Sequence, residues 1–349
     1  MMKKTAKFLF EFLVFSFVVL IFFIIITDHE NIQRRVSASL FFSFEKLIPS
    51  LYFSLVASLM LTNSGLYLYI GKMFSLASRK IFRVSEKIFS VFIISNLAGY
   101  PTGAKLLSSL VKRNIIDNDD VKKAAPVMFS AGPAFILSVS QNKTEGIIIF
   151  ISVFLTNLIM LFIYGRKSSL NLYENENEAI QITSENFVKS IVSAFGSMIN
   201  IAAMISFFAV FTSILQENGL YFLSPVLEVS SLANISLTDC IYTSIAAAYV
   251  SFGGICVIFQ AASELKNNFS VFYFIGLRLF SALISAIISF SFSFFYRKNE
   301  TEPVFLSFET DFNGKTIYFS DYFFVLFALF IILLYKTEII IKGYKSKKI

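Results

Sequence analysis

Glycine, proline and lysine interrupt an otherwise apolar stretch of the chain at Ser95–Lys105. Pro101 lacks a backbone N–H and clashes with the preceding helical turn, and it disfavours helical geometry at Tyr100. Non-helical backbone persists at membrane depth only where it is buried in protein or lines a wet cavity. Its free N–H and C=O groups can then bind a polar solute or an ion. The predicted binding residues are Asn96, Gly99, Tyr100, Pro101, Thr102, Gly103 and Lys105.

The lysine of this first break admits two interpretations. A lysine that faces lipid is costly, so Lys105 should face the protein interior or reach the membrane interface. The alternative is a kinked structural helix with Lys105 at the lipid headgroups.

A second break carries polar groups in the other half of the chain. Gly253 and Gly254 permit a broken helix or a close helix crossing. Gln260 follows in the same apolar segment and needs a hydrogen-bond partner. Arg278 lies several residues into the next span, where a charged side chain is a functional-site hypothesis by default; the alternative is an arginine anchored at the headgroups. We predict that all four residues bind the solute.

A third break at Gly132 and Pro133 completes the predicted binding set. It is expected to face the first break across the protein interior, and a helix-packing kink is the alternative. Asn157 and Asn200 are expected to form hydrogen bonds between helices, which is a common structural use of asparagine in membrane helices.

Signatures of catalysis are absent from the sequence. Gly314-Lys315-Thr316 ends like a phosphate-binding loop, but Glu309 occupies the position of its first glycine. His29 is the single histidine, and no group of Cys, His and carboxylate residues has zinc spacing. We therefore expect no enzyme activity, no catalytic residue, no cofactor and no metal site.

Composition places the three breaks in a polytopic membrane protein. Of the 349 residues 56% are hydrophobic, 44 are phenylalanine and only 15% are charged, whereas about 25% of an ordinary soluble domain is charged. The net charge of +7 comes from short basic clusters between apolar runs, which is the pattern that membrane orientation and headgroup contact produce. We therefore expect the lipid bilayer to be a partner, and we expect no binding to nucleic acid.

Nine apolar segments are candidates for helices in the membrane. They are Phe8–Thr27, Ser39–Thr62, Ile88–Leu110, Val121–Ser140, Gly146–Tyr164, Phe187–Leu215, Asp239–Leu265, Val271–Tyr296 and Phe319–Tyr335. Basic residues at both ends favour two cytoplasmic termini and an even number of crossings. The predicted fold is an all-α polytopic membrane protein with about eight transmembrane helices, some of them broken or re-entrant.

The two halves of the chain resemble each other at a fixed distance of 154 residues. Leu61–Tyr67 matches Leu215–Tyr221, and Gly99 matches Gly253. Such repeats of broken helices are typical of secondary transporters, and chance similarity between apolar segments is the alternative. An inverted repeat requires an odd number of crossings in each half. Such a repeat gives seven crossings and places the two termini on opposite sides of the membrane. The charge pattern instead favours two cytoplasmic termini, so the two arguments conflict.

The expected division of the chain follows from these segments. It comprises an N-terminal transmembrane helix at 1–34, a first gate-like half at 35–165, a polar acidic loop at 166–186, a second gate-like half at 187–300, and a loop with the last helix and a basic tail at 301–349. The repeat permits a homodimer without requiring one.

Three ordered motifs resemble those of the YlbJ-type sporulation integral membrane proteins of endospore-forming Firmicutes. The first is Gly99–Lys105, the second is the Gly132–Ile136 run, and the third is Ser251–Gln260 with Arg278-Leu279 after it. The resemblance covers about residues 35 to 300. It implies a gate-type or nucleoside-recognition membrane domain, similar to domains of concentrative nucleoside transporters, ferrous-iron transporters and spore maturation proteins.

The resemblance also implies a role in endospore formation, at the step at which the cortex is built. The expected location is the mother-cell or forespore membrane. The leading hypothesis is a gate-type transporter or channel for an unidentified small polar solute. The alternative is a membrane scaffold that positions the cortex machinery without transport, because fold analogy does not fix function.

Overall fold

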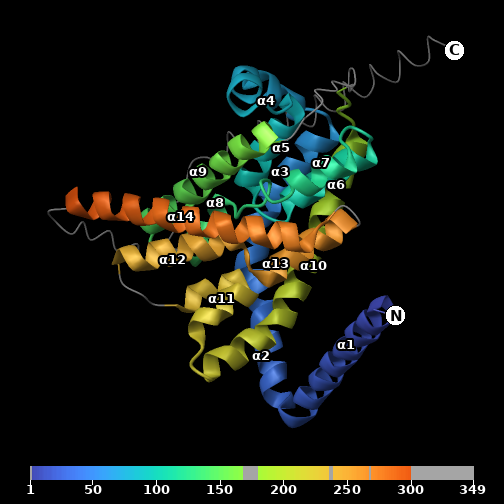
Figure 1. Ribbon diagram of the computed structural model, residues 1–349, viewed down its shortest axis with the longest axis vertical. Helices are drawn as coiled ribbons and strands as arrows, with labels where there is room; N and C mark the ends of the chain where they lie inside the picture. Colours follow the sequence, from blue (N-terminus) through green and yellow to red (C-terminus); the bar gives the residue numbers. More distant parts are fainter. Residues whose placement is uncertain (1, 168–179, 236–238, 267–268, 300–349) are drawn as a thin grey trace.

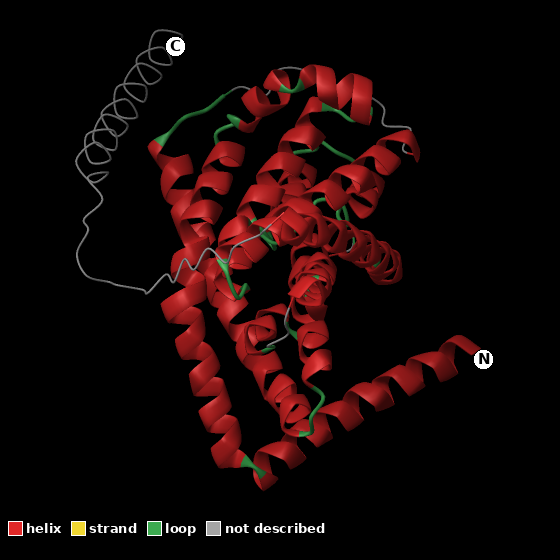
Figure 2. Ribbon diagram, turned by 90° about the vertical axis from the view of Figure 1, so that its left-hand side faces the viewer, coloured by secondary structure: helices red, strands yellow, loops and turns green. Residues whose placement is uncertain are grey.

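The computed structural model describes residues 2–167, 180–235, 239–266 and 269–299, and all regular structure in these ranges is helical. Figure 2 shows these helices joined by short loops. The elements in chain order are α1 (Met2–Thr27), α2 (His29–Phe42), η1 (Ser43–Leu47), α3 (Ile48–Asn63), α4 (Tyr67–Met73), η2 (Ala77–Phe82), α5 (Glu86–Ala98), α6 (Thr102–Lys112), α7 (Asn118–Ala124), α8 (Pro133–Val139), α9 (Lys143–Lys167), α10 (Ser184–Glu217), η3 (Tyr221–Leu223), α11 (Ser224–Leu227), η4 (Val229–Asn234), α12 (Asp239–Phe252), α13 (Gly254–Leu265) and α14 (Val271–Asn299).

Five helices of the described chain are long and apolar enough to cross a membrane. They are His29–Asn63, Lys143–Gly165, Ser184–Glu217, Ile241–Leu265 and Val271–Tyr296. The predicted count of about eight is not confirmed. The first predicted segment lies within α1, whose apolar part Val14–Thr27 is shorter than these five. The last predicted span, Phe319–Tyr335, lies outside the described residues.

Two predicted spans are divided in the structure. Ile88–Leu110 is split between α5 and α6, as its glycine and proline content predicted. Val121–Ser140 is divided between α7 and α8 by the non-helical segment 125–132, which ends at the predicted break, Gly132 and Pro133. This segment is apolar because it is buried in protein, and hydropathy does not distinguish that environment from lipid.

Helices α2 and α3 form a long rod, and α1 extends from it as an apolar arm. A π-helical turn, η1, joins α2 to α3 just before Pro49, which occupies the first turn of α3. The helix continues through this turn, and proline and π-helical turns are both recognised sites of local irregularity within a helix. In Figure 1, α1 projects away from the body of the molecule. Its Phe12, Phe15 and Phe22 are exposed, as expected of side chains that lipid covers.

The long helix α10 packs against α2 and α3, and the half-helices α6 and α13 pack against each other. Figure 1 shows α12 and α14 running side by side, crosswise to α10. The five long apolar helices therefore do not share one direction.

A ladder of serines explains the close packing of α12 on α14. Ser281, Ser285, Ser289 and Ser293 recur at every fourth position of α14, and all four are buried. The Ser285 hydroxyl donates to the Ala247 carbonyl at 3.0 Å. Small residues at such spacing let two membrane helices approach closely, and their hydroxyls bridge the helices. The opposite face of α14 carries exposed apolar side chains such as Leu283 and Ile287.

Candidate functional site

The first break is positioned by a glycine that the helix cannot continue through. Helix α5 ends at Ala98, Gly99 has a φ of +83°, and α6 begins at Thr102 after a cis peptide bond between Tyr100 and Pro101. Glycine adopts this backbone region at little cost, whereas residues with a Cβ are strained there. The predicted break at these residues is thus present in the structure.

The first and third breaks touch through their backbones. A Cβ on Gly99 would lie 2.5 Å from the Gly132 nitrogen, and a Cβ on Gly132 would lie 3.0 Å from the Ala98 carbonyl carbon. Helix α8 then begins at Pro133. The expectation that these two breaks face each other is confirmed by this contact. Only glycine leaves room for so close an approach of two chain segments.

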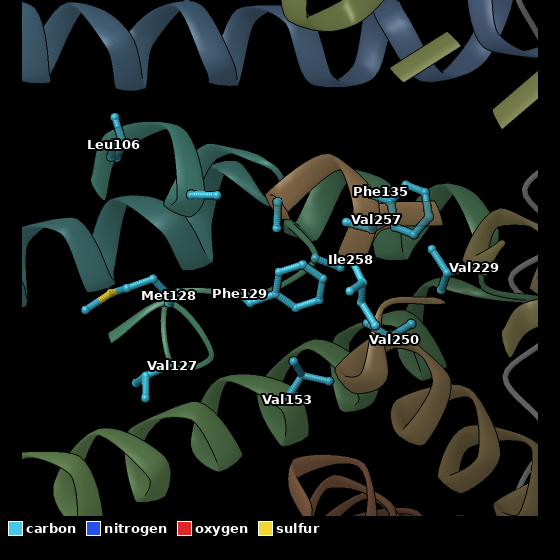
Figure 3. Close-up of a cluster of buried hydrophobic side chains, with 14 of the residues drawn as sticks. Leu106, Val127, Met128, Phe129, Phe135, Val153, Val229, Val250, Val257 and Ile258 are labelled. Carbon is cyan, nitrogen blue, oxygen red and sulfur yellow. The ribbon is translucent and has the colours of Figure 1, made fainter. Parts of the chain in front are cut away.

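The second break meets the same non-helical segment from the other side. Gly253 and Gly254 have φ values of +90° and +77° and separate α12 from α13. A Cβ on Gly253 would lie 2.2 Å from the Phe129 ring. Figure 3 shows this ring projecting from the non-helical segment toward Ile258 of α13. All three breaks therefore converge around Phe129.

Arg278 is fully buried beside this junction. Its Nη1 donates to the Pro126 carbonyl at 2.9 Å and to Asn157 Oδ1 at 3.1 Å. Its Nη2 donates to the carbonyl of Ser251 and, at 3.1 Å, to that residue's hydroxyl. The guanidinium carbon lies 5.2 Å from the centre of the Phe129 ring, a cation–π distance. The interpretation of Arg278 as a headgroup anchor is therefore wrong.

A chain of amides extends the arginine's contacts to the first break. Asn157 Nδ2 donates to Asn96 Oδ1 at 2.8 Å, and Asn96 Nδ2 donates to the Phe92 carbonyl at 2.8 Å. Both asparagines are fully buried. The network joins α5, α9 and α14, so Asn157 forms the interhelical hydrogen bonds that the sequence predicted. The hydrogen-bonding groups of this network mainly pair with one another.

Lys105 lies apart from this network. Its ammonium group donates to the Ser193 carbonyl at 2.8 Å and to the Ser197 hydroxyl, both on α10. The side chain thus points into protein, as one of the two interpretations predicted. It serves as a tie between α6 and α10. Thr102 and Gly103 are buried at the start of α6, where a Cβ on Gly103 would overlap the Met128 carbonyl oxygen.

A narrow cavity opens beside the contact between the first and third breaks. Its volume is about 20 Å³. That is room for roughly one water. Four predicted residues line it: Gly99, Tyr100, Gly132 and Gln260. The remaining lining comprises Leu47, Leu51, Phe135, Ile201, Ile205, Glu228, Val229 and Val257. Arg278, Lys105, Gly253 and Gly254 are not among the lining residues.

Two polar groups of the cavity have few or no partners. The Tyr100 hydroxyl is buried without a hydrogen-bond partner in the described part of the chain. The Gln260 amide donates only a weak contact, at 3.5 Å, to the Cys256 sulfur. The described residues contain no group of three or more His, Cys, Asp or Glu placed to hold a metal ion.

Sequence reasoning missed Glu228, the one acidic residue of the cavity lining. The side chain is 5% exposed and accepts a hydrogen bond from the Ser230 N–H at 3.0 Å and another from the Ser230 hydroxyl. It lies in the connection between α10 and α12, for which the sequence motifs predict no role. A signal is nevertheless present, because Glu228 is the only charged residue between Glu217 and Asp239.

The chain is similar to a curated membrane protein of a spore-forming bacterium. It is 29% identical over 136 residues to the sporulation integral membrane protein YlbJ from Bacillus subtilis (strain 168). The similar stretch is 37% of this chain and 33% of the relative, so about a third of that protein's length is covered. No protein-family model matches the chain, and no solved structure matches it.

Proposed function

We propose that the chain is an integral membrane protein of endospore formation that lets a small polar solute pass, by a gate built from its three breaks. The single observation that carries the proposal is that the backbone contact of Gly99 with Gly132 borders a buried cavity with polar groups. The similarity to a sporulation membrane protein supports the setting. The proposed step is cortex formation, and the proposed location is the mother-cell or forespore membrane.

The geometry of the two halves supports a gate with a repeated design. Gly65 and Gly219, 154 residues apart, have φ values of +78° and +75°, and Gly99 and Gly253, at the same spacing, have +83° and +90°. In each half a long helical stretch precedes the first glycine, and a helix broken at the second glycine follows it. Matching backbone irregularities at one spacing favour a duplicated unit over chance similarity.

The narrow cavity indicates how such a gate would work. It holds roughly one water, so a solute passes only when the breaks separate. The Tyr100 hydroxyl and the Gln260 amide then become available for a polar solute. The Gly99 N–H and C=O and the Gly132 C=O are hydrogen-bonded within the chain, to Ser95, Thr102 and Ile136.

Cysteine accessibility in native membranes tests the gate. Single cysteines replace Leu51, Val257 or Gln260 in the cavity, on a background in which Cys240 and Cys256 are substituted. We expect them to react with a water-soluble thiol reagent, because an opening gate admits water. An Asn118→Cys variant, exposed outside the long apolar helices, is the reactive control. A Leu283→Cys variant, on the lipid-facing side of α14, is the unreactive control.

Unreactive cavity cysteines would contradict the transport proposal. If the three cavity cysteines stay as unreactive as Leu283→Cys while Asn118→Cys reacts, the breaks are packing devices and the transport proposal fails. In a sporulating host, Gln260→Leu should abolish function while protein levels stay normal. Degradation of this variant would instead assign the Gln260 side chain to folding.

The dense packing of the same region supports a second candidate function. The Arg278 guanidinium makes four hydrogen bonds within the chain and the cavity holds about one water, as in a rigid scaffold. A scaffold that positions cortex machinery would depend on its loops at 166–186 and 297–318. Replacement of both loops by neutral linkers should then stop sporulation. Unharmed sporulation would remove this candidate.

A further inference from the structure

Glu228 is a buried acid that no cation balances in the described chain. Its side chain is 5% exposed, and the hydrogen bonds to its carboxylate come from Ser230 and the Ser231 backbone. None of the ion pairs between described residues includes it. An ionised carboxylate is costly in an apolar environment without a paired charge. The neutral acid avoids that cost.

The groups around Glu228 favour a neutral acid as well. Cys256 and Gln260 of α13 and Tyr100 of the first break are uncharged neighbours, and α3 and α10 contribute only leucine and isoleucine to the cavity. Arg278 and Glu228 share Tyr100 as a neighbour. Arg278 lies beyond the stacked rings of Tyr100 and Phe129, whose centres are 5.0 Å apart. The arginine's donors are directed to carbonyls and to Asn157, not to the acid.

The cavity offers a path for a proton beside the acid. The Tyr100 hydroxyl is buried, lacks a partner and belongs to the same lining as Glu228. The space open to water there, about 20 Å³, accommodates roughly one water. A single water with polar neighbours can join such groups by hydrogen bonds. Burial raises the pKa of the Glu228 carboxyl, and the hydrogen bonds from Ser230 oppose this rise.

We infer that Glu228 is a proton-binding site of the cavity, protonated when the breaks are closed and deprotonated when the cavity opens to water. The step binds one proton to one carboxylate oxygen and releases it to water, with no other bond formed or broken. Resting on the proposed transport function, this site would link solute passage to proton movement. The proposed ligand is a proton. Binding of a metal cation instead is one of the outcomes that the experiment can give.

Infrared spectroscopy of the purified full-length protein tests the site without any transport assay. A protonated carboxyl has a C=O stretch that an ionised carboxylate lacks. We expect this band at neutral pH in the wild type, its loss at alkaline pH, and its absence from Glu228→Gln, which keeps the shape and neutrality of the acid. Glu45→Gln removes an exposed carboxyl and serves as the matched control, which should retain the band.

Three outcomes would overturn the inference. The first is a band that persists unchanged in Glu228→Gln, which would place the protonated carboxyl elsewhere. The second is no band at neutral pH in the wild type. The third is stabilisation of the wild type by sodium or potassium ions that Glu228→Gln abolishes, which would assign a metal cation to the site. Unreactive cavity cysteines would remove the transport proposal while leaving the infrared result standing, so the two failures are distinguishable.

Discussion

Arg278 and Glu228 are both buried ionisable side chains next to one aromatic pair, but their hydrogen-bond partners differ. Arg278 contacts Phe129 and uses four hydrogen bonds to reach three residues of other helices or loops. Glu228 shares a cavity with Tyr100 and accepts its hydrogen bonds from Ser230 and Ser231, two and three positions away. The arginine joins distant parts of the chain, whereas the acid is held only locally.

This difference separates a fixed charge from an exchangeable one. Removal of a cation that many carbonyls share leaves those carbonyls unpaired, so its position is tied to the fold. An acid with local partners and space beside it can gain or lose a proton while its neighbours stay in place. The three breaks therefore contain a rigid side at Arg278 and an adaptable side at Glu228.

The strongest test of the rigid side is the substitution Arg278→Gln. It removes up to four hydrogen bonds to a charged group, each contributing about 1.5–3 kcal/mol, so we expect the free energy of unfolding to fall by at least about 4 kcal/mol. Chemical unfolding of the protein in detergent measures this loss. Arg79→Gln is the control, because Arg79 is half exposed and its ion pair with Glu86 contributes about 1 kcal/mol or less. Equal effects of the two variants would contradict a fixed Arg278.

The next largest effect is expected where the second break meets Phe129. Gly253→Ala places a Cβ 2.2 Å from the ring at a φ of +90°. Left-handed backbone and overpacking together cost about 2–4 kcal/mol, which thermal unfolding would show as a lower Tm. Gly196→Ala is the matched control, since that glycine lies within α10 with no atom within 4 Å of the added Cβ. It should stabilise by about 0.5–1 kcal/mol, and a loss there would undermine the comparison.

The adaptable side predicts a stability that depends on pH. The pKa of Glu228 is raised by burial in the folded protein, so its contribution is fully present below the unfolded pKa. That contribution is lost as pH rises through the folded pKa, by about 1.4 kcal/mol for each tenfold difference in proton affinity between the folded and unfolded states. The Tm of the wild type should therefore fall toward alkaline pH more steeply than that of Glu228→Gln. Parallel pH profiles of the two proteins would show that the acid is not protonated when folded.

The positions of the breaks could be predicted from sequence, because glycine and proline determine local backbone geometry at Gly99, Pro101 and Gly253. The partners of Arg278 could not, since carbonyls such as those of Pro126 and Ser251 are present at every position and reveal nothing in a sequence. Glu228 meets Tyr100 across 128 residues, which only the tertiary fold decides. The number of membrane crossings could not be predicted from sequence either, because a buried segment such as 125–132 is as apolar as one that contacts lipid.

The smallest expected effect sharpens the comparison at the edge of the rigid side. Asn96 and Asn157 are joined by one hydrogen bond of 2.8 Å, while Asn157 also accepts from Arg278. A double-mutant cycle of Asn96→Ala and Asn157→Ala should give a coupling energy of about 0.6 kcal/mol, the average for hydrogen bonds between membrane helices. The same cycle with Arg278→Gln as background should give a smaller value if the arginine orients the Asn157 amide. An unchanged value would show that the two asparagines form an independent contact, and the network would then end at Asn157.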